Sequence, residues 1–220
     1  MIAVPANPDQ EPTLKNSTWD RIEQARAEWN VLEHPFYQRW SAGELSREEL
    51  ADYSGQYRYA TEAIARMSAD VATAAPAPEQ AGLRAHSREE HEHIAMWDGF
   101  VEVVGGTVGA EPNPETLECV EAWTKEDGFG PQLARLYAVE SGQPEISKTK
   151  TEGLAAHYDI HDAPGNRYFT VHEKMDLHHA SEGRKLIEKH MNDFSEDEIV
   201  AAAEEAFKAN WRLLDGVTAS

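Results

Sequence analysis

Cysteine is almost absent from the sequence, with Cys119 alone among 220 residues. An intramolecular disulfide and a zinc site built from several thiolates are therefore excluded. Apolar runs are short as well, and none approaches the ~18 consecutive apolar residues of a membrane-spanning helix. The first residues, MIAVPANPDQEP, lack the basic segment followed by an apolar stretch that marks a secretory signal. We therefore expect a cytoplasmic protein.

Basic residues are scarce relative to acidic ones. Lys and Arg number 20 against 40 Asp and Glu, which gives a formal net charge of −20. Phosphate groups would be repelled by this charge, so we expect neither a nucleic-acid partner nor an anionic membrane partner. Strand signals are also missing, because β-branched residues nowhere alternate with polar ones over a sustained stretch.

The patterns that are present are helical and predict an all-α protein. Residues 1–17 contain three prolines and no apolar period, so we expect a flexible N-terminal tail there and a single helical domain over residues 18–220. Capping boxes mark helix starts at Ser46 and Ser195, each followed three residues later by a glutamate. A bundle of seven to nine helices is expected. These helices are predicted at residues 19–32, 34–41, 46–74, 79–104, 114–125, 130–141, 145–158, 164–191 and 196–215.

Helix-breaking residues set the expected boundaries. The Pro-Ala-Pro segment 76–78 separates two long helices, and Gly105-Gly106 ends the second of them. The segment Ser141-Gly142-Gln143-Pro144 is expected to interrupt a later helix, because proline cannot continue helical hydrogen bonding. Glu140 would then stand directly beside a helix break, where an acidic group can face a cavity.

Histidines are clustered in the chain. Six of the ten lie in the windows 86–93 and 172–179. On a helical wheel at ~100° per residue, Asp176 and His179 lie within about 40° of His172, on the face that also carries apolar side chains. A carboxylate and two imidazoles on a core-facing stripe cost several kcal/mol unless they are paired or bind a cation.

The helix expected at 79–104 repeats this pattern. His86, Glu90 and His93 lie on its apolar face. Glu90-x-x-His93 is the spacing that carboxylate-bridged dimetal bundles place on inward helix faces. Glu89 and Glu92 point elsewhere and are interpreted as solvated surface residues.

A third helix contributes Glu140, which shares its face with apolar residues and is expected to point inward. A lone His–Asp pair is usually a structural hydrogen bond, and Glu-x-x-His alone arises by chance in acidic helices. Three helices that each offer inward ligands are harder to explain in this way. Three carboxylates and three imidazoles suit iron or manganese, and six ligands suit two ions with open positions. The candidate ligands are Glu90, His93, Glu140, His172, Asp176 and His179.

Four segments resemble the haem-oxygenase-like fold group, which includes thiaminase II, pyrroloquinoline-quinone synthase and the haem-oxygenase-like diiron oxidases. The segments are LEHPFYQRWSAGELSREEL at 32–50, EEHEHIAMW at 89–97, YAVESGQPEISKTKTEGLAAHY at 137–158 and RYFTVHEKMDLHHA at 167–180. The resemblance covers the helical body from about residue 19 to residue 190. It implies a haem-oxygenase-like helical bundle, and a homodimer because members of the group are commonly dimers.

The resemblance also implies a ligand set for two iron ions, or for one manganese and one iron. His93, Glu140 and the trio His172, Asp176 and His179 match ligands of the group. In one member a carboxylate ligand stands seven residues before the histidine, where this chain has His86. We expect Glu90 to take over this role, with His86 as the rival ligand.

The implied activity is that of a dinuclear oxidase or oxygenase that uses O2 and an external reductant. One member of the group is linked to p-aminobenzoate formation from a tyrosine of its own chain. By the same resemblance, Tyr37 matches the tyrosine proposed to be consumed, Tyr168 matches another tyrosine near the metals, and Lys150 matches a lysine implicated as amine donor. Without the resemblance, Lys150 would be interpreted as a surface lysine. The substrate is expected to be a small molecule or the chain's own tyrosine.

Two alternatives remain open at this point. The chain could be a metal-free hydrolase like thiaminase II or a quinone-forming oxidase like pyrroloquinoline-quinone synthase. Thiaminase II uses a cysteine nucleophile, whereas Cys119 has no base beside it in the sequence and is interpreted as a small buried side chain. The other alternative is a non-enzymatic protein whose acidic faces bind a basic partner.

Overall fold

The computed structural model describes residues 17–218, and this part of the chain holds eight α-helices, two short 3-10 turns and no strand. The all-α prediction and the predicted number of helices are confirmed. The 3-10 turns are Val31–Glu33 and Met191–Asp193. The helices are α1 (Thr18–Glu28), α2 (Pro35–Ala42), α3 (Arg47–Ala74), α4 (Gln80–Val104), α5 (Pro114–Trp123), α6 (Phe129–His157), α7 (Arg167–His190) and α8 (Glu196–Thr218).

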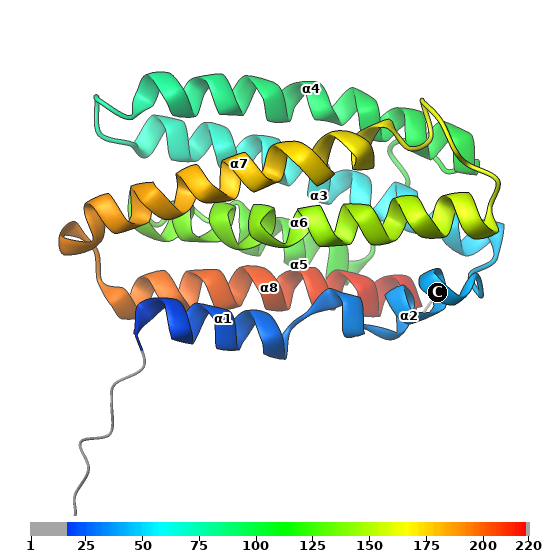
Figure 1. Ribbon diagram of the computed structural model, residues 1–220, viewed down its shortest axis with the longest axis horizontal. Helices are drawn as coiled ribbons and strands as arrows, with labels where there is room; N and C mark the ends of the chain where they lie inside the picture. Colours follow the sequence, from blue (N-terminus) through cyan, green and yellow to red (C-terminus); the bar gives the residue numbers. More distant parts are fainter. Residues whose placement is uncertain (1–16, 219–220) are drawn as a thin grey trace, which may run out of the picture.

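The long helices run roughly along one axis, as Figure 1 shows. Helix α3 packs against α4, and α7 packs against α6. Helix α8 packs against α1, α5 and α6, so that α1 and α8 close the side opposite α4. Helix α6 contacts α2, α3, α5, α7 and α8 and is therefore the central helix. A helix with neighbours on so many sides is buried nearly all round, so its side chains reach several separate parts of the core.

Local signals in the sequence explain where the helices begin and end. Ser46 caps α3 and forms the predicted capping box with Glu49. The Ser195 hydroxyl accepts from the backbone N–H of Glu198 at the start of α8. Gly105 ends α4 with φ of 77°, a conformation that glycine adopts without steric cost.

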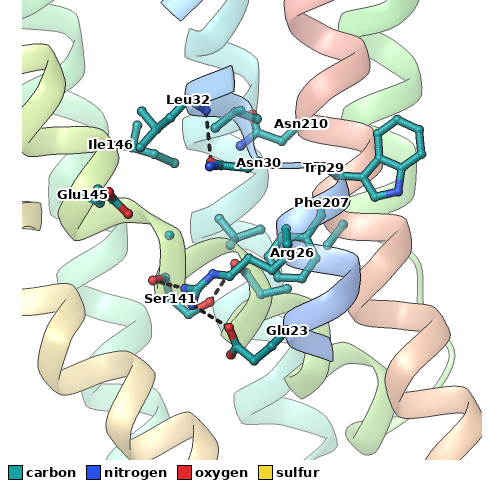
Figure 2. Close-up of a pocket in the computed structure, with 16 residues that line it drawn as sticks. Glu23, Arg26, Trp29, Asn30, Leu32, Ser141, Glu145, Ile146, Phe207 and Asn210 are labelled. Atoms are coloured by element: carbon teal, nitrogen blue, oxygen red, sulfur yellow. Dashed lines mark hydrogen bonds and ion pairs between the residues drawn. The ribbon is translucent and has the colours of Figure 1, made fainter. Parts of the chain in front are cut away.

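The predicted interruption at residues 141–144 is wrong, because α6 continues through Pro144. Proline offers no N–H to the carbonyl of Glu140 four residues earlier, so one helical hydrogen bond is missing at this place. The guanidinium of Arg26 donates to the neighbouring carbonyl of Ser141 from outside the helix (Figure 2). Packing against five other helices holds the two halves of α6 in line, and Glu140 lies inside a continuous helix.

The N-terminal tail predicted for residues 1–17 lies outside the described residues except for Ser17, which is the N-cap of α1. Within residues 17–218, no helix is both long enough and apolar enough to cross a membrane.

Candidate metal centre and its aromatic cage

Three helices bring carboxylates and imidazoles together in the interior. Helix α4 supplies His86, Glu90 and His93, which lie on one face because their spacings of four and three residues match the helical repeat. Helix α6 supplies Glu140. Helix α7 supplies the His-x3-Asp-x2-His trio. All six candidate ligands predicted from the sequence are buried, and His86 is the most exposed side chain of the cluster.

The first group of donors joins all three helices. One atom from each of His86, Glu90, Glu140 and His179 lies within 4.8 Å of the others. The closest contact is between His86 Nε2 and Glu140 Oε1, at 2.8 Å. Glu90 Oε1 lies 3.6 Å from His86 Nε2 and 3.7 Å from His179 Nδ1. Two nitrogens and two carboxylates therefore surround one small volume.

The second group contains Glu90, His93 and His172, whose donor atoms also lie within 4.8 Å of one another. Glu90 Oε2 lies 3.3 Å from His93 Nδ1 and 3.9 Å from His172 Nε2. Glu90 thus presents one carboxylate oxygen to each group. A carboxylate shared in this way is the arrangement that bridges two metal ions in carboxylate-rich helical bundles.

Asp176 lies beside these groups but is not one of their mutually close donors. Its Oδ1 is 3.4 Å from Nδ1 of His179. Both of its carboxylate oxygens are buried and have no hydrogen-bond partner. The structure therefore brings all six predicted ligands to one place, and it brings His86 there as well.

The donor atoms are buried, and apart from their contacts with one another they have no hydrogen-bond partner. Each buried polar atom that stays unsatisfied costs about 1–3 kcal/mol. Groups of this kind are retained where a cation compensates them, and mixed nitrogen and oxygen donors suit iron or manganese. The residues present therefore fit a dinuclear metal centre. The eight atoms are His86 Nε2, Glu90 Oε1, His93 Nδ1, Glu140 Oε1, both oxygens of Asp176, His172 Nε2 and His179 Nδ1.

Two of the imidazoles are oriented by hydrogen bonds on their outer side. His172 Nδ1 lies 2.7 Å from the backbone carbonyl of Tyr168, which requires a proton on Nδ1 and leaves Nε2 free to face Glu90. His179 Nε2 lies 3.2 Å from Glu89, so that Nδ1 faces the cluster. Glu89 is exposed as expected, but it contacts the site, which its position on the helical wheel did not indicate.

Charges within the cluster balance one another when no metal is bound. Burial by itself lowers the pKa of His86, but the carboxylates of Glu140 and Glu90 outweigh it and raise this pKa to about 10. Burial raises the pKa of Glu140, and the nearby His86 opposes this shift. The pKa of Glu90 lies well below its usual value, because hydrogen bonding from His172, His86 and His93 outweighs burial. In the metal-free protein, protonated imidazoles therefore compensate the negative charge of the carboxylates, as bound metal cations would otherwise do.

Lys150 lies on α6, deeper in the same interior, and is fully buried. The interpretation of Lys150 as a surface lysine is therefore wrong. Its Nζ has no hydrogen-bond partner, and burial holds the pKa of this amine well below its usual value. Five aromatic rings surround it, with centroids 4.6–5.6 Å from Nζ. We call these rings the aromatic cage; they belong to Tyr37, Tyr53, Tyr57, Trp97 and Phe169.

Both predicted tyrosines lie in this region. Tyr37 is a member of the aromatic cage, and its hydroxyl is 3.4 Å from that of Tyr53. Tyr168 stacks on the ring of His172 at a centroid distance of 3.8 Å. Its hydroxyl is buried without a hydrogen-bond partner. Burial raises the pKa of both phenols well above their usual value, so both are protonated.

Sequence reasoning missed the other residues of this region. Tyr57 and Trp97 are buried, and they line the space around Lys150. Gln143 donates to the hydroxyl of Tyr57 from α6. Cys119 is buried on α5 as expected, and burial raises the pKa of its thiol.

Solved structures with a similar fold share most of the chain length. A domain of unknown function with a haem-oxygenase-like fold from Shewanella denitrificans has a TM-score of 0.77 and 19% identity, over 93% of each chain. A TenA homologue from P. horikoshii OT3 has a TM-score of 0.73 and 16% identity, over 92% of this chain and 98% of that one. These similarities establish the haem-oxygenase-like fold.

The fold is of the haem-oxygenase-like class, and its buried donor cluster is of the kind that suits iron or manganese. Residues 82–211 match the family described as iron-containing redox enzyme, and residues 21–125 match the TENA/THI-4/PQQC family. The first match covers more than half of the chain, and the chain belongs to this family of iron-containing redox enzymes.

Three proteins of similar sequence are each named 4-aminobenzoate synthase. A protein named 4-aminobenzoate synthase from Nitrosomonas europaea is 31% identical over 90% of this chain and 88% of its own length. A 4-aminobenzoate synthase from Chlamydia muridarum is 29% identical over 89% of this chain and 88% of its own length. One from Chlamydia trachomatis is 29% identical over 84% of this chain and 85% of its own.

Proposed function

We propose that this chain is a dinuclear iron enzyme that forms 4-aminobenzoate from one of its own tyrosines. The observation that carries the proposal is the pair of donor groups that share Glu90, in the same interior as a buried lysine in an aromatic cage. The name of the relatives supports the product. Metal-free chemistry would leave the eight unpartnered donor atoms without a role.

The donors divide naturally between two ions. His86, Glu140 and His179 would hold one ion and His93 and His172 the other, with the carboxylate of Glu90 shared and that of Asp176 adjacent. Two iron ions, or one manganese and one iron, would supply the activation of O2 there, with electrons from an external reductant. The outer hydrogen bonds to His172 and His179 keep the ligating nitrogens directed inward.

Tyr37 is the proposed source of the product. The ring and Cβ of a tyrosine contain all the carbons of 4-aminobenzoate, once the Cα–Cβ bond is broken, Cβ becomes a carboxylate and an amino group replaces the phenol oxygen. The ring of Tyr37 lies 5.6 Å from Nζ of Lys150. A neutral amine is a nucleophile, and burial lowers the pKa of Lys150 and so favours its neutral form. Lys150 is therefore the proposed nitrogen source; transfer of its nitrogen would break the Cε–Nζ bond and leave Cε oxidised, with O2 as the oxidant.

Aromatic rings in contact connect the donors with Tyr37. Tyr168 stacks on His172, and the ring of Trp97 lies 4.9 Å from that of Tyr168. Trp97 lies 6.0 Å from Tyr53, whose hydroxyl contacts that of Tyr37. Because all of these side chains are buried, bulk water is kept away from the oxidised ring.

Isotope labelling tests the proposal directly. The protein is produced with 13C-labelled tyrosine or 15N-labelled lysine, loaded with iron without oxygen, and then given O2 and a reductant. We expect labelled 4-aminobenzoate from each preparation, at no more than one molecule per chain, measured by mass spectrometry. Product without the tyrosine label would refute an origin in the protein's own ring.

Two tyrosine variants locate the source. Tyr37→Phe should form no product while it still binds iron. Tyr59→Phe is the control, because the Tyr59 hydroxyl bonds the backbone of Ala110 outside the aromatic cage. Full product yield from Tyr37→Phe would exclude Tyr37 and would direct attention to Tyr168.

The homodimer expected from the resemblance is part of this proposal. Light scattering should then give a particle of about twice the chain mass of 24.6 kDa. A monomer over the working concentration range would refute it without affecting the chemistry, because every donor described above belongs to one chain.

A further inference from the structure

A cavity of about 370 Å³ lies between α4, α6 and α7 and meets the donor cluster from the outside. Its lining includes His86, Glu140 and His179, which are members of the first donor group. Each of these side chains has a buried atom without a hydrogen-bond partner. The cavity therefore ends on side chains that are able to bind a cation.

The exposure of the donors shows that only one half of the cluster is near this cavity. The side chains of His86 and His179 are 14% and 7% exposed. In the other half, those of His93 and His172 are 3% and 2% exposed. An ion that arrives through the cavity meets the first donor group before the second.

We infer that this cavity is the port through which divalent transition-metal ions reach the donor cluster. The inference rests on the dinuclear centre proposed above and adds the route by which that centre is filled. The volume of about 370 Å³ can hold a hydrated ion, and the ion can exchange its water for donors at the inner end. Aqueous cations are drawn towards it by the chain's net charge of −20.

The charged residues at the mouth of the port also favour a cation as its ligand. Glu79 and Glu182 line the cavity but are ion-paired, at 2.7 Å with Lys189 and at 2.6 Å with Lys185. Glu89 instead contacts the imidazole of the donor His179, so its carboxylate links the mouth to the first donor group. Leucine side chains form part of the wall, and a low-dielectric surface strengthens the attraction of a nearby carboxylate for a cation. The apolar wall residues include Leu83, Leu133, Leu136 and Leu186.

The cavity drawn in Figure 2 has no such connection. It has a volume of about 250 Å³, lies between α1, α6 and α8, and has none of the donor residues in its lining. Arg26 reaches across it to the carbonyl of Ser141, and Asn210 lies on its α8 side. It therefore offers a matched control for the port.

Two glycines allow the port to be narrowed without touching a donor. Gly183 lines the port, and a Cβ added there would meet only Tyr137, at an ordinary contact distance of 3.7 Å. Gly82 lines it on α4, where a Cβ would meet nothing within 4 Å. Both lie inside helices, where replacing glycine favours folding. We choose Gly183→Phe and Gly82→Phe as port variants and Asn210→Phe as the control in the other cavity.

The test follows the absorbance of cobalt(II) as it binds to the metal-free protein in a stopped-flow instrument. We expect Gly183→Phe and Gly82→Phe to slow binding about tenfold or more, because ions must then wait for local opening of the helices. The final cobalt stoichiometry and spectrum should equal those of the wild type. Asn210→Phe should bind at the wild-type rate.

Circular dichroism first establishes whether each variant is folded. If Gly183→Phe is not folded, the binding rate of Gly82→Phe alone is used. Wild-type binding rates in the folded port variants would overturn the port. A lower final stoichiometry would also overturn it, because the cavity would then be part of the coordination site and not a route. If the wild type itself bound no cobalt, the dinuclear centre would fail together with the port.

Discussion

Replacing Lys150 by methionine should make the protein more stable at neutral pH. The amine is fully buried and has no hydrogen-bond partner. Attraction between an ammonium and aromatic rings reaches about 2 kcal/mol in a dry site, whereas the effective cost of burying an ion is several kcal/mol. The burial cost is the larger, which is why the pKa of Lys150 lies well below its usual value. Methionine fills the same space without an ionisable group.

The magnitude follows from proton binding. Below pH 10.5 the amine in the unfolded chain holds a proton, whereas in the folded protein it holds one only below its lowered pKa. Between these two values, this one group makes the free energy of unfolding rise with pH by about 1.4 kcal/mol per pH unit. The destabilisation is therefore relieved as the pH approaches 10.5. Lys150→Met should remove this slope and gain most at neutral pH.

Urea denaturation of metal-free protein between pH 7 and pH 10 measures both effects. Lys148→Met is the control, because Lys148 lies on the same helix but is exposed, with only a 4.0 Å contact to Glu152. We expect Lys150→Met to be more stable than wild type at pH 7 and the difference to shrink towards pH 10, while Lys148→Met shows no such trend. A folded Lys150→Met that is less stable than wild type at pH 7 would show that the lysine is charged in its cage.

Four further outcomes are expected. His172→Ala should lower the iron content and abolish the burst of oxygen consumption, measured by elemental analysis and an oxygen electrode; an unchanged burst would remove His172 from the site. Binding of metal near pH 7 should release protons, because a pKa of about 10 keeps His86 protonated in the metal-free protein; a pH indicator that records no release would contradict this. Gly153→Ala should destabilise the fold by about 1–3 kcal/mol, because its Cβ would lie 2.5 Å from the ring of Trp40. Gly82→Ala, with open space around its Cβ, should instead stabilise it by about 0.5–1 kcal/mol in a thermal melt.

Much of the candidate metal site was predicted from the helical repeat alone. Residues 86, 90 and 93 share one face of α4 whatever the rest of the chain does, and the same holds for the trio on α7. The choice of Glu90 over His86 as the ligand on α4 rested on the Glu-x-x-His spacing and on the resemblance to the fold group. The structure brings both side chains to the cluster, so the alternative itself was too narrow.

The environment of Lys150 could not be predicted in the same way. Its local sequence, ISKTKTEG, is polar and resembles a solvated surface. Its burial comes from aromatic side chains on four other helices, and their convergence depends on the packing of α6 at the centre of the bundle. The continuity of α6 through Pro144 was missed for the same reason, because tertiary contacts outweigh a local breaking signal.

Helix α6 places Glu140 and Lys150 in two different parts of the same interior. Glu140 and Lys150 are ten residues apart on this continuous helix, a rise of about 15 Å. The donor group of Glu140 therefore lies at the port, while Lys150 lies further along the bundle. Tyr168 stacks on His172 of the second donor group, and its ring lies 4.9 Å from that of Trp97 in the aromatic cage. The first group is thus placed to receive ions from solvent, and the second is placed to act on the buried tyrosines. Because Glu90 belongs to both groups, the side that takes up metal and the side that faces the aromatic rings are held together by one carboxylate.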